Sequence, residues 1–423
     1  MKILIVKLSA IGDVVHSLPA LYALREKFPS AHIVWLVEEA ASGLLIGHPL
    51  LDRVIISKRK TWLNDILKQG MCKKALSEIR SFVRDLRDTE YDIVLDLHAL
   101  LKSGLLIWLS RSGRKIGYRE GDEGSSVFLN ERIAPYDLDR HAVLRYMNLA
   151  EHIGARPNGY HFPIPVSDTD KNRVNELLKG YEVSGSFIVI NPVAKWETKL
   201  WDTGKFASLA DRCIQELRLP VVFTGSRDDR EEVRSMIAQM HEQAIDFCGR
   251  TNLGELAYLY SLSSVMITTD TGPMHIGAAV NARVVALFGP TAPWRTGPFG
   301  DGHIVIRTNE PCSPCFRKKC PDPKCMSGIK VDVVFEAVKR QLGEQNQTNQ
   351  TNQTNQINSV GERRTGGNMI SKTLLDILAC PKCKGDIRLN ESKDGLICDK
   401  CKLLYEIKDD IPIMLIDEAK KID

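Results

Sequence analysis

The sequence predicts an α/β protein with two Rossmann-like halves that face each other across a cleft, followed by a small third unit. Three observations predict this fold. Short β-branched runs alternate with longer helical patterns, this alternation pauses and then restarts, and a polar repeat sets the last stretch apart. Strands that alternate with helices favour parallel sheets with helices on both faces. The length of 423 residues suits two or three domains.

The first half is predicted to cover residues 1–165. One of its helical patterns is "ALSEIRSFVRDLR" at residues 75–87. Its expected strands are "KILIVKL" (2–8), "HIVWLVE" (32–38), "RVIIS" (53–57), "YDIVLDLHA" (91–99) and "KIGY" (115–118).

The second half is predicted to cover residues 166–343, after a pause at residues 154–168 that is rich in Pro and Gly. Two such halves place a cleft between the carboxyl edges of their sheets, where ligands bind in folds of this class. The expected strands of this half are "SFIVINP" (186–192), "PVVFTGS" (220–226), "SVMITTD" (264–270) and "RVVALFGP" (283–290).

The third unit is predicted to cover residues 369–423, after a disordered linker at residues 344–368. The linker contains "QNQTNQTNQTNQ", which has no apolar side chain to bury. The unit begins with Met369, which suggests a fusion of two genes. Two C-x2-C pairs, with fourteen residues between them, indicate structural zinc, since so small a unit lacks a large core. The expected ligands are Cys380, Cys383, Cys398 and Cys401.

The composition narrows the cellular context. The net charge of +4 gives no strong nucleic-acid signal, so we expect no direct nucleic-acid partner. No stretch approaches the roughly 18 apolar residues of a membrane helix. The apolar N-terminal run is too short for a signal peptide and lacks its cleavage site. We therefore expect a cytoplasmic protein, in which clustered cysteines indicate metal before disulfides.

Asp13 is the first candidate functional residue. It follows the first strand in the loop "KLSAIGD", and Gly12 lets the chain turn sharply there. A loop at this edge of a parallel sheet points into the cleft. The alternative is that Asp13 caps the next helix.

A second candidate site is the turn in "TTDTGPMHIGAAV" at residues 268–280. Backbone N–H groups at the start of the helix suit a phosphate, and Thr271 can add a hydroxyl donor. Asp270, Gly272 and His275 complete the group, with His275 about one turn into the helix. The alternative is a capped helix with a half-buried histidine.

Two further segments add donor-site candidates. Lys195 and Lys199 follow a strand in "NPVAKWETKLW", where cations can meet a diphosphate. In "FTGSRDDREEV", Asp228 or Asp229 is placed to accept hydrogen bonds from ribose hydroxyls. The alternative for these acids is the ordinary first turn of a helix.

Six motifs follow one another along residues 1–343: "VKLSAIGDVVHSLPAL", "YDIVLDLHALLKSGLL", "RHAVLRY", "TKLW", "TTDTGPMHIGAA" and "LFGPTAPWRTGPFG". In these motifs the chain resembles the bacterial ADP-heptose:lipopolysaccharide heptosyltransferases, glycosyltransferase family 9. The resemblance implies a GT-B fold and an inverting direct displacement, with Asp13 as base and no metal for transfer. It implies that Lys199 and the Thr271–Gly272 turn contact the diphosphate of ADP-heptose, beside Asp270 and His275.

The same resemblance implies an acceptor site for Kdo-lipid A at the inner face of the inner membrane, where the enzyme would be peripheral. The "LLKS" and "HAVLRY" motifs favour addition of the first heptose to Kdo, with the second or another core heptose as the alternative. The residues matched to acceptor binding are Arg59, Lys60, Lys102, His141 and Arg145.

Two features remain open at the level of sequence. The segment "CSPCFRKKCPDPKC", with Cys312, Cys315, Cys320 and Cys325, fits either four zinc ligands or reduced thiols. Residues 369–418 resemble small zinc-ribbon proteins that partner and activate methyltransferases. That resemblance implies either a methyltransferase partner, with the tail as the working part, or an inert fused module.

Overall fold

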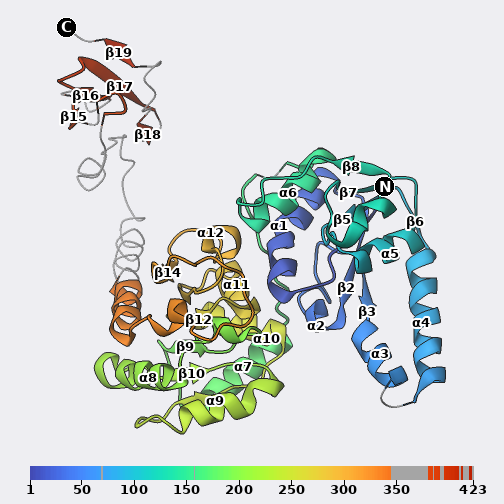
Figure 1. Cartoon of the computed structure of the whole chain (residues 1–423), viewed down its shortest axis with the longest axis horizontal. Coiled ribbons are helices and arrows are strands. Elements are labelled where there is room, and N and C mark those ends of the chain that lie inside the picture. The colour runs from blue at the N-terminus through green and yellow to red at the C-terminus, as the bar shows by residue number, and fades with distance from the viewer. Residues whose placement is uncertain are drawn as a thin grey trace, which may run out of the picture. The chain divides into compact units, whose positions relative to one another are not determined.

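The computed structural model describes residues 1–67, 70–156, 158–343, 380–383, 385–390, 395–408, 411–412 and 419–421. The chain divides into two compact units, residues 1–349 and 350–423, and each is described by itself (Figure 1). The predicted linker at residues 344–368 lies outside the described residues. Within the described residues, no helix is both long and apolar enough to span a bilayer.

The first half of the larger unit contains a parallel six-stranded sheet in the order β3-β2-β1-β5-β7-β8. A two-stranded pair, β4 (Glu90–Tyr91) and β6 (Arg111–Ser112), lies apart from it. The strands of the sheet are β1 (Lys2–Val6), β2 (His32–Glu38), β3 (Arg53–Ser57), β5 (Ile93–Asp96), β7 (Lys115–Tyr118) and β8 (Glu131–Ile133).

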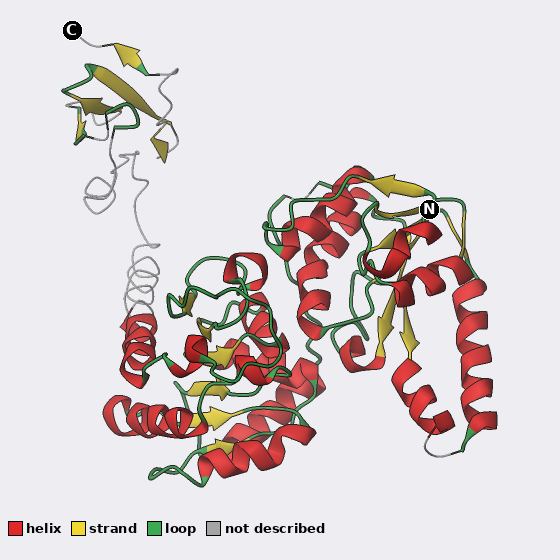
Figure 2. Cartoon of the chain, in the orientation of Figure 1, coloured by secondary structure: helices red, strands yellow, loops and turns green. Residues whose placement is uncertain are grey.

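Helices cover both faces of this sheet (Figure 2). Alternate residues of β1 point to opposite faces: Ile3 and Ile5 pack in the cluster that includes α1 and α6, whereas Leu4 and Val6 pack in the cluster of α3, α4 and α5. The helices are α1 (Ile11–Lys27), α2 (Glu39–Ser42), α3 (Arg59–Leu67), α4 (Cys72–Arg87), α5 (Leu101–Leu109), η1 (Asp122–Phe128) and α6 (Ala142–His152).

The second half repeats this plan with a parallel sheet in the order β11-β10-β9-β12-β13-β14. Its strands are β9 (Ile188–Asn191), β10 (Val221–Phe223), β11 (Ile245–Asp246), β12 (Val265–Thr269), β13 (Val284–Leu287) and β14 (Ile304–Ile306). Its helices are α7 (Asp168–Gly180), η2 (Glu197–Lys199), α8 (Thr203–Leu217), η3 (Arg227–Asp229), α9 (Arg230–Ile237), α10 (Leu253–Leu262), α11 (Gly272–Ala279), α12 (Pro293–Thr296), α13 (Lys324–Ser327) and helical residues 331–343.

The expected strands of both halves appear at the expected places, most of them shorter than expected at their ends. The sequence missed β8, β11 and β14, which have two or three residues each and carry too little periodicity to stand out.

The smaller unit is an antiparallel arrangement around a very small core. That core holds Leu396, Leu403 and Tyr405 together with two cysteines. Its strands are β15 (Arg388–Leu389), β16 (Gly395–Cys398), β17 (Leu403–Lys408), β18 (Ile411–Pro412) and β19 (Lys420–Lys421).

Candidate active site

Asp13 lies in the first turn of α1, just after the carboxyl end of β1. Its Oδ2 accepts a hydrogen bond from the backbone N–H of Ala10 at 3.1 Å, so the carboxylate does close this turn. The side chain nevertheless keeps 39% of its surface exposed. The two interpretations of Asp13 are therefore compatible, because a carboxylate that closes the turn is also open to a ligand.

Tyr146 and Lys7 lie close to the other carboxylate oxygen of Asp13, Oδ1. The sequence analysis did not single out either residue. The Tyr146 hydroxyl on α6 donates to Oδ1 at 2.9 Å and accepts from Nζ of Lys7 at 2.6 Å. Lys7 Nζ also donates to the Leu97 carbonyl at 2.9 Å and lies 3.9 Å from Asp13 Oδ1. A signal existed for Lys7, because a buried lysine directly follows an apolar strand, and Tyr146 ends the motif "RHAVLRY".

The groups around the Asp13 carboxyl keep it ionised. Burial alone would raise the pKa of its carboxyl, but the Lys7 ammonium, the Ala10 N–H and the Tyr146 hydroxyl together lower that pKa below its ordinary value. Burial raises the pKa of Tyr146 well above the usual tyrosine range, and the negative charge of Asp13 adds to this. Asp13 is thus a carboxylate and Tyr146 a neutral hydroxyl donor near neutral pH.

The predicted phosphate turn joins β12 to α11 in the second half. Oδ2 of Asp270 is 2.6 Å from Nζ of Lys199 and accepts from the Thr291 hydroxyl, also at 2.6 Å. Lys199 keeps 16% of its side chain exposed and Asp270 only 5%. Thr271 is the N-cap residue of α11, and its side chain makes no capping bond. The Lys199 ammonium therefore lies next to the backbone N–H groups at the start of α11.

The other two donor-site candidates are less closely tied to this turn. Lys195 is exposed on the loop after β9, where Nζ of Lys199 lies 4.6 Å from the ring centroid of Trp196. Oδ2 of Asp229 accepts from the N–H and the hydroxyl of Ser226 at 2.7 and 2.6 Å. This local turn agrees with the helix-start alternative, and ribose binding by Asp229 stays a prediction.

The residues around Asp13, at the start of α1, contact the predicted phosphate turn, at the start of α11. Two glycines, Gly12 and Gly272, allow this close approach. A Cβ on Gly12 would lie 2.3 Å from Cδ2 of His275, and a Cβ on Gly272 would lie 2.9 Å from Cβ of Ile11. His275 is buried, and its ring centroid lies 4.2 Å from that of His16 in an edge contact. Burial lowers the pKa of His275 to about 4, so its ring is neutral at pH 7. His275 thus packs between the halves beside the turn.

Replacing Gly12 with alanine is expected to lower the free energy of unfolding of the larger unit by about 1–3 kcal/mol, because the new methyl group overlaps the His275 ring. Thermal unfolding followed by circular dichroism measures this. Gly113→Ala is the matched control, since a Cβ at Gly113 meets nothing within 4 Å. Equal melting of the two variants would contradict the close contact between the loops.

Three of the predicted acceptor residues lie near one buried acid of the first half. Oε1 of Glu38 pairs with Nζ of Lys102 at 3.2 Å and with the guanidinium of Arg59 at 3.3 Å. Lys102 also donates to the Ser9 hydroxyl at 2.9 Å, just before α1. Lys60 is exposed beside Arg59 at the start of α3. These cations therefore lie at the same edge of the sheet as the first turn of α1.

The other two acceptor candidates lie at the start of α6. His141 accepts from the Val143 N–H through Nδ1 at 3.2 Å, so Nε2 carries the proton and donates to the Gly297 carbonyl of the second half at 3.1 Å. Next to Tyr146, the Nε of Arg145 is buried and has no hydrogen-bond partner among the residues that the structure describes. A buried donor that lacks a partner costs free energy, so a ligand oxyanion is a favourable partner for Arg145.

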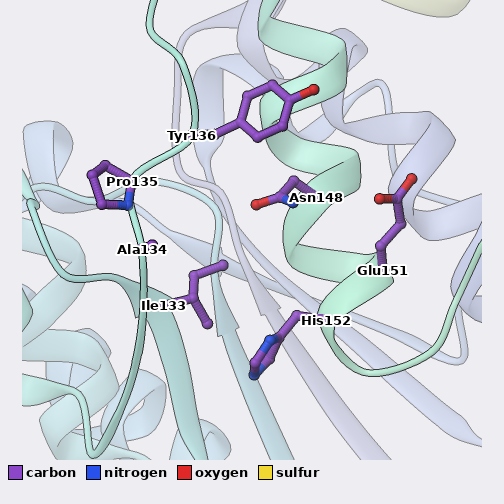
Figure 3. Close-up of a pocket in the computed structure, with 7 residues that line it drawn as sticks. All are labelled: Ile133, Ala134, Pro135, Tyr136, Asn148, Glu151 and His152. Atoms are coloured by element: carbon purple, nitrogen blue, oxygen red, sulfur yellow. The ribbon is translucent and has the colours of Figure 1, made fainter.

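A pocket of about 420 Å³ lies elsewhere on the first half, between α6 and the residues that follow β8 (Figure 3). His152 in its wall is already bound to Glu131 at 2.7 Å through Nε2. None of the predicted acceptor residues lines this pocket, so it is not the predicted site. Its lining residues are Ile133, Ala134, Pro135, Tyr136, Asn148, Glu151 and His152.

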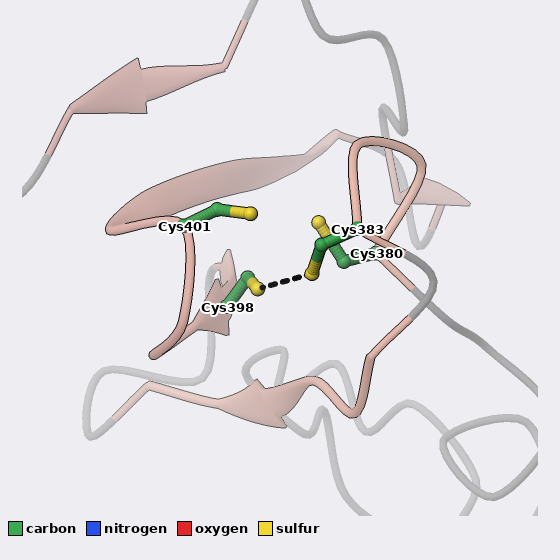
Figure 4. A group of neighbouring side chains, drawn as sticks. All are labelled: Cys380, Cys383, Cys398 and Cys401. Atoms are coloured by element: carbon green, nitrogen blue, oxygen red, sulfur yellow. Dashed lines mark hydrogen bonds between the residues drawn. The ribbon is translucent and has the colours of Figure 1, made fainter.

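The four cysteines of the two C-x2-C pairs come together in the smaller unit (Figure 4). Their Sγ atoms all lie within 4.8 Å of one another, and those of Cys383 and Cys398 are 3.6 Å apart. Zn–S bonds of about 2.3 Å in a tetrahedron place sulfur atoms about 3.8 Å apart, so this group fits such an ion. None of the four is in a disulfide. The predicted metal site is confirmed as a group of cysteines that could bind a metal.

The cluster of Cys312, Cys315, Cys320 and Cys325 differs from the C-terminal one in how its cysteines are arranged. Among the residues that the structure describes, only the C-terminal cysteines gather closely enough to share one ion. In the other cluster, Cys312 is exposed and Cys325 is buried. For Cys312, Cys315, Cys320 and Cys325, zinc ligands and reduced thiols both stay predictions.

Comparison with known sequences agrees with these two units. Residues 79–326 match the model of glycosyltransferase family 9 (heptosyltransferase), and residues 371–410 match that of the Trm112p-like proteins. The chain is 30% identical over 331 residues to the lipopolysaccharide heptosyltransferase 1 of Pseudomonas aeruginosa, covering 76% of this chain and 87% of that protein.

Solved structures support the fold of the larger unit. A glycosyl transferase family 9 protein from Veillonella parvula superposes with a TM-score of 0.68 at 24% identity, covering 81% of this chain and 97% of that one. The ADP-heptose lps heptosyltransferase II of E. coli gives 0.66 at 24% identity, covering 82% and 100%. The predicted GT-B fold is thus confirmed. The chain belongs to glycosyltransferase family 9, the heptosyltransferases, and carries a C-terminal Trm112p-like domain.

Proposed function

We propose that this enzyme transfers heptose from ADP-heptose to the Kdo inner core of lipopolysaccharide, with inversion, and that Asp13 is the general base. The observation that carries the proposal is the direct contact between the Asp13 loop and the turn of Lys199 and Asp270. The names of the similar proteins, a lipopolysaccharide heptosyltransferase 1 and an ADP-heptose lps heptosyltransferase II, support the donor and the acceptor class.

The proposed reaction is a single displacement. The acceptor hydroxyl attacks the anomeric carbon and gives its proton to Asp13, and the bond from that carbon to the diphosphate oxygen breaks. Tyr146 and Lys7 orient the carboxylate and keep it ionised. The Lys199 ammonium and the N–H groups at the start of α11 stabilise the charge on the departing ADP. The proposed step uses these donors and includes no metal.

The basic residues of the first half would bind the acidic acceptor. In the structure, Glu38 partly neutralises Lys102 and Arg59. A Kdo carboxylate would compete with Glu38 for these cations and would give Arg145 Nε a partner. The exposed Lys60 would meet a further anionic group. First-heptose addition is the proposed step, and addition of the second or another core heptose is the alternative.

A thermal-shift series tests the donor. ADP-heptose is expected to raise the melting temperature more than ADP, and both more than UDP or GDP, because a ligand that binds only the native state stabilises it by an amount that grows with the logarithm of its concentration divided by Kd. At a concentration of one hundred times Kd, the expected gain is about 2.7 kcal/mol. If UDP and ADP raise the melting temperature equally, the site does not prefer an adenine nucleotide. If ADP-heptose raises it no more than ADP does, the site does not bind the heptose.

The Trm112p-like match supports a second function for the tail. We propose that residues 369–423 bind structural zinc and dock on a methyltransferase. The enzyme itself would comprise an acceptor domain, residues 1–165, and a donor domain, residues 166–343. A methyltransferase that co-purifies with the full chain but not with residues 1–343 would support the docking.

A further inference from the structure

The hairpin of α3 and α4 presents apolar side chains to solvent. Here "the hairpin" means residues 59–87, of which residues 68 and 69 lie outside the described part. Figure 1 shows its two helices running side by side. Leu67, next to the connection between them, is 78% exposed. The exposed apolar residues of the hairpin are Leu63, Leu67, Met71 and Leu76.

The hairpin is nevertheless firmly attached at its inner face. Trp62 and Phe82 are buried, with ring centroids 5.3 Å apart, and both belong to a hydrophobic cluster that includes β1 and β2. The Trp62 indole N–H donates to Oε2 of Glu78 at 2.9 Å. Each helix has thus already buried one apolar face, so Leu63 and Leu67 form a second apolar face that folding does not use.

Positive charge is concentrated on the same segment. Residues 59–87 contain eight Lys and Arg but only three Asp and Glu, a balance of +5, whereas the whole chain has +4. The rest of the chain is therefore slightly acidic. Lys73 and Lys74, at the start of α4 beside Met71, are both exposed. Exposed leucines flanked by lysines are typical of surfaces that enter the interface of an anionic bilayer.

The hairpin also adjoins the candidate acceptor site. Helix α3 begins at Arg59, which pairs with Glu38 in the basic group of the first half. The same helix ends at Leu67, so a single rigid element connects that group to the apolar tip. An acceptor anchored in a bilayer would reach the cleft with the tip in contact with the lipid.

We propose that the tip of the hairpin, formed by Leu63, Leu67, Met71 and Leu76 with Lys73 and Lys74, is the surface that docks this enzyme on an anionic phospholipid bilayer. This inference rests on the proposed function for its biological reason, but its physical basis is the charge and exposure of the hairpin alone. Neither a nucleotide nor a sugar is needed for the docking.

Vesicle flotation tests the docking with the full chain. The wild type is expected to float with vesicles of phosphatidylglycerol and phosphatidylcholine, and not with phosphatidylcholine alone. Leu63→Ser with Leu67→Ser should weaken partitioning at least tenfold, since two leucines no longer bury their side chains. Lys73→Gln with Lys74→Gln should weaken it about fivefold per lysine, and added salt should do the same.

Matched controls use the same substitutions on the second half. Leu262→Ser with Val333→Ser removes two other exposed apolar side chains, and Lys179→Gln with Lys330→Gln removes two other exposed lysines. These variants should bind vesicles as the wild type does. If they weaken binding as much as the hairpin variants, or if the wild type ignores anionic vesicles, the docking surface is wrong. If the wild type is a dimer and the leucine variant is a monomer, the tip binds a second copy of the chain instead of a bilayer.

Failure of the docking can be separated from failure of the proposed transfer. Transfer to a delipidated, water-soluble Kdo acceptor should be equal in the wild type and in the leucine variant, since neither leucine lies in the candidate site. Transfer to an acceptor embedded in vesicles should fall with vesicle binding. A wild type that binds vesicles but transfers no heptose would overturn the proposed function and leave the docking intact.

Discussion

Asp13→Asn is expected to reduce kcat for heptose transfer by between about a hundredfold and ten-thousandfold, the usual contribution of a positioned base. Asparagine has the size of aspartate and can still accept the hydrogen bond that Tyr146 donates to Oδ1. It cannot take a proton from the acceptor hydroxyl. The loss should therefore appear in the chemical step, measured as single-turnover transfer with saturating donor and acceptor.

Two controls separate the loss of the base from a loss of donor binding or of folding in Asp13→Asn. Donor affinity should change little, because Lys199 and the start of α11 are untouched. Asp301→Asn, at an exposed acid of the second half, should transfer at the wild-type rate. If Asp13→Asn folds, binds the donor and keeps near-normal turnover, Asp13 is not the base.

The pH profile examines the same carboxylate. A base must be deprotonated, and Lys7, Ala10 and Tyr146 lower the pKa of Asp13 against the effect of burial. Activity should therefore not fall on account of Asp13 between pH 7 and pH 5. Tyr146→Phe removes one hydrogen bond to the carboxylate, raises its pKa and should move the acid limb of kcat/KM to higher pH. A purely structural role of Tyr146 would leave that limb in place.

The sequence predicts the large elements of this fold because each carries its own periodic signal. The run at residues 2–6 is apolar throughout since both faces of β1 are buried, Ile3 and Ile5 on one side and Leu4 and Val6 on the other. The turn between β12 and α11 was also predictable, because Asp270 directly follows a strand and Gly272 opens a helix. Such features depend on neighbours in the chain.

The contacts of Asp13 could not be predicted from local pattern, because they join distant segments. Lys7 and Tyr146 are 139 residues apart in sequence, and their hydrogen bond exists only once α6 packs beside α1. The contact of Gly12 with the His275 ring likewise depends on how the two halves meet. The sequence placed His275 beside an anion, but not in the packed interface where the structure places it.

Removal of metal is expected to unfold the smaller unit while the larger one stays folded. Among its described residues, the core holds Leu396, Leu403 and Tyr405 beside two cysteines, and units of this size usually need a metal or another cross-link to fold. Structural zinc contributes on the order of 10 kcal/mol to the folding of such sites near pH 7. Chelation, or the substitution Cys398→Ser, should therefore make residues 369–423 sensitive to protease in the full chain.

Metal analysis gives this expectation a sharp control. One zinc ion per chain is expected for the wild type and none for Cys398→Ser. Cys312→Ser should retain the full zinc content if its cluster consists of reduced thiols, because the cysteines whose Sγ atoms lie within 4.8 Å of one another are those of the C-terminal unit. A tail that resists protease without metal would contradict the zinc site, and two ions per chain would identify residues 312–325 as a second zinc site. Transfer to a soluble acceptor should survive chelation, because every residue assigned to the reaction lies in residues 1–349.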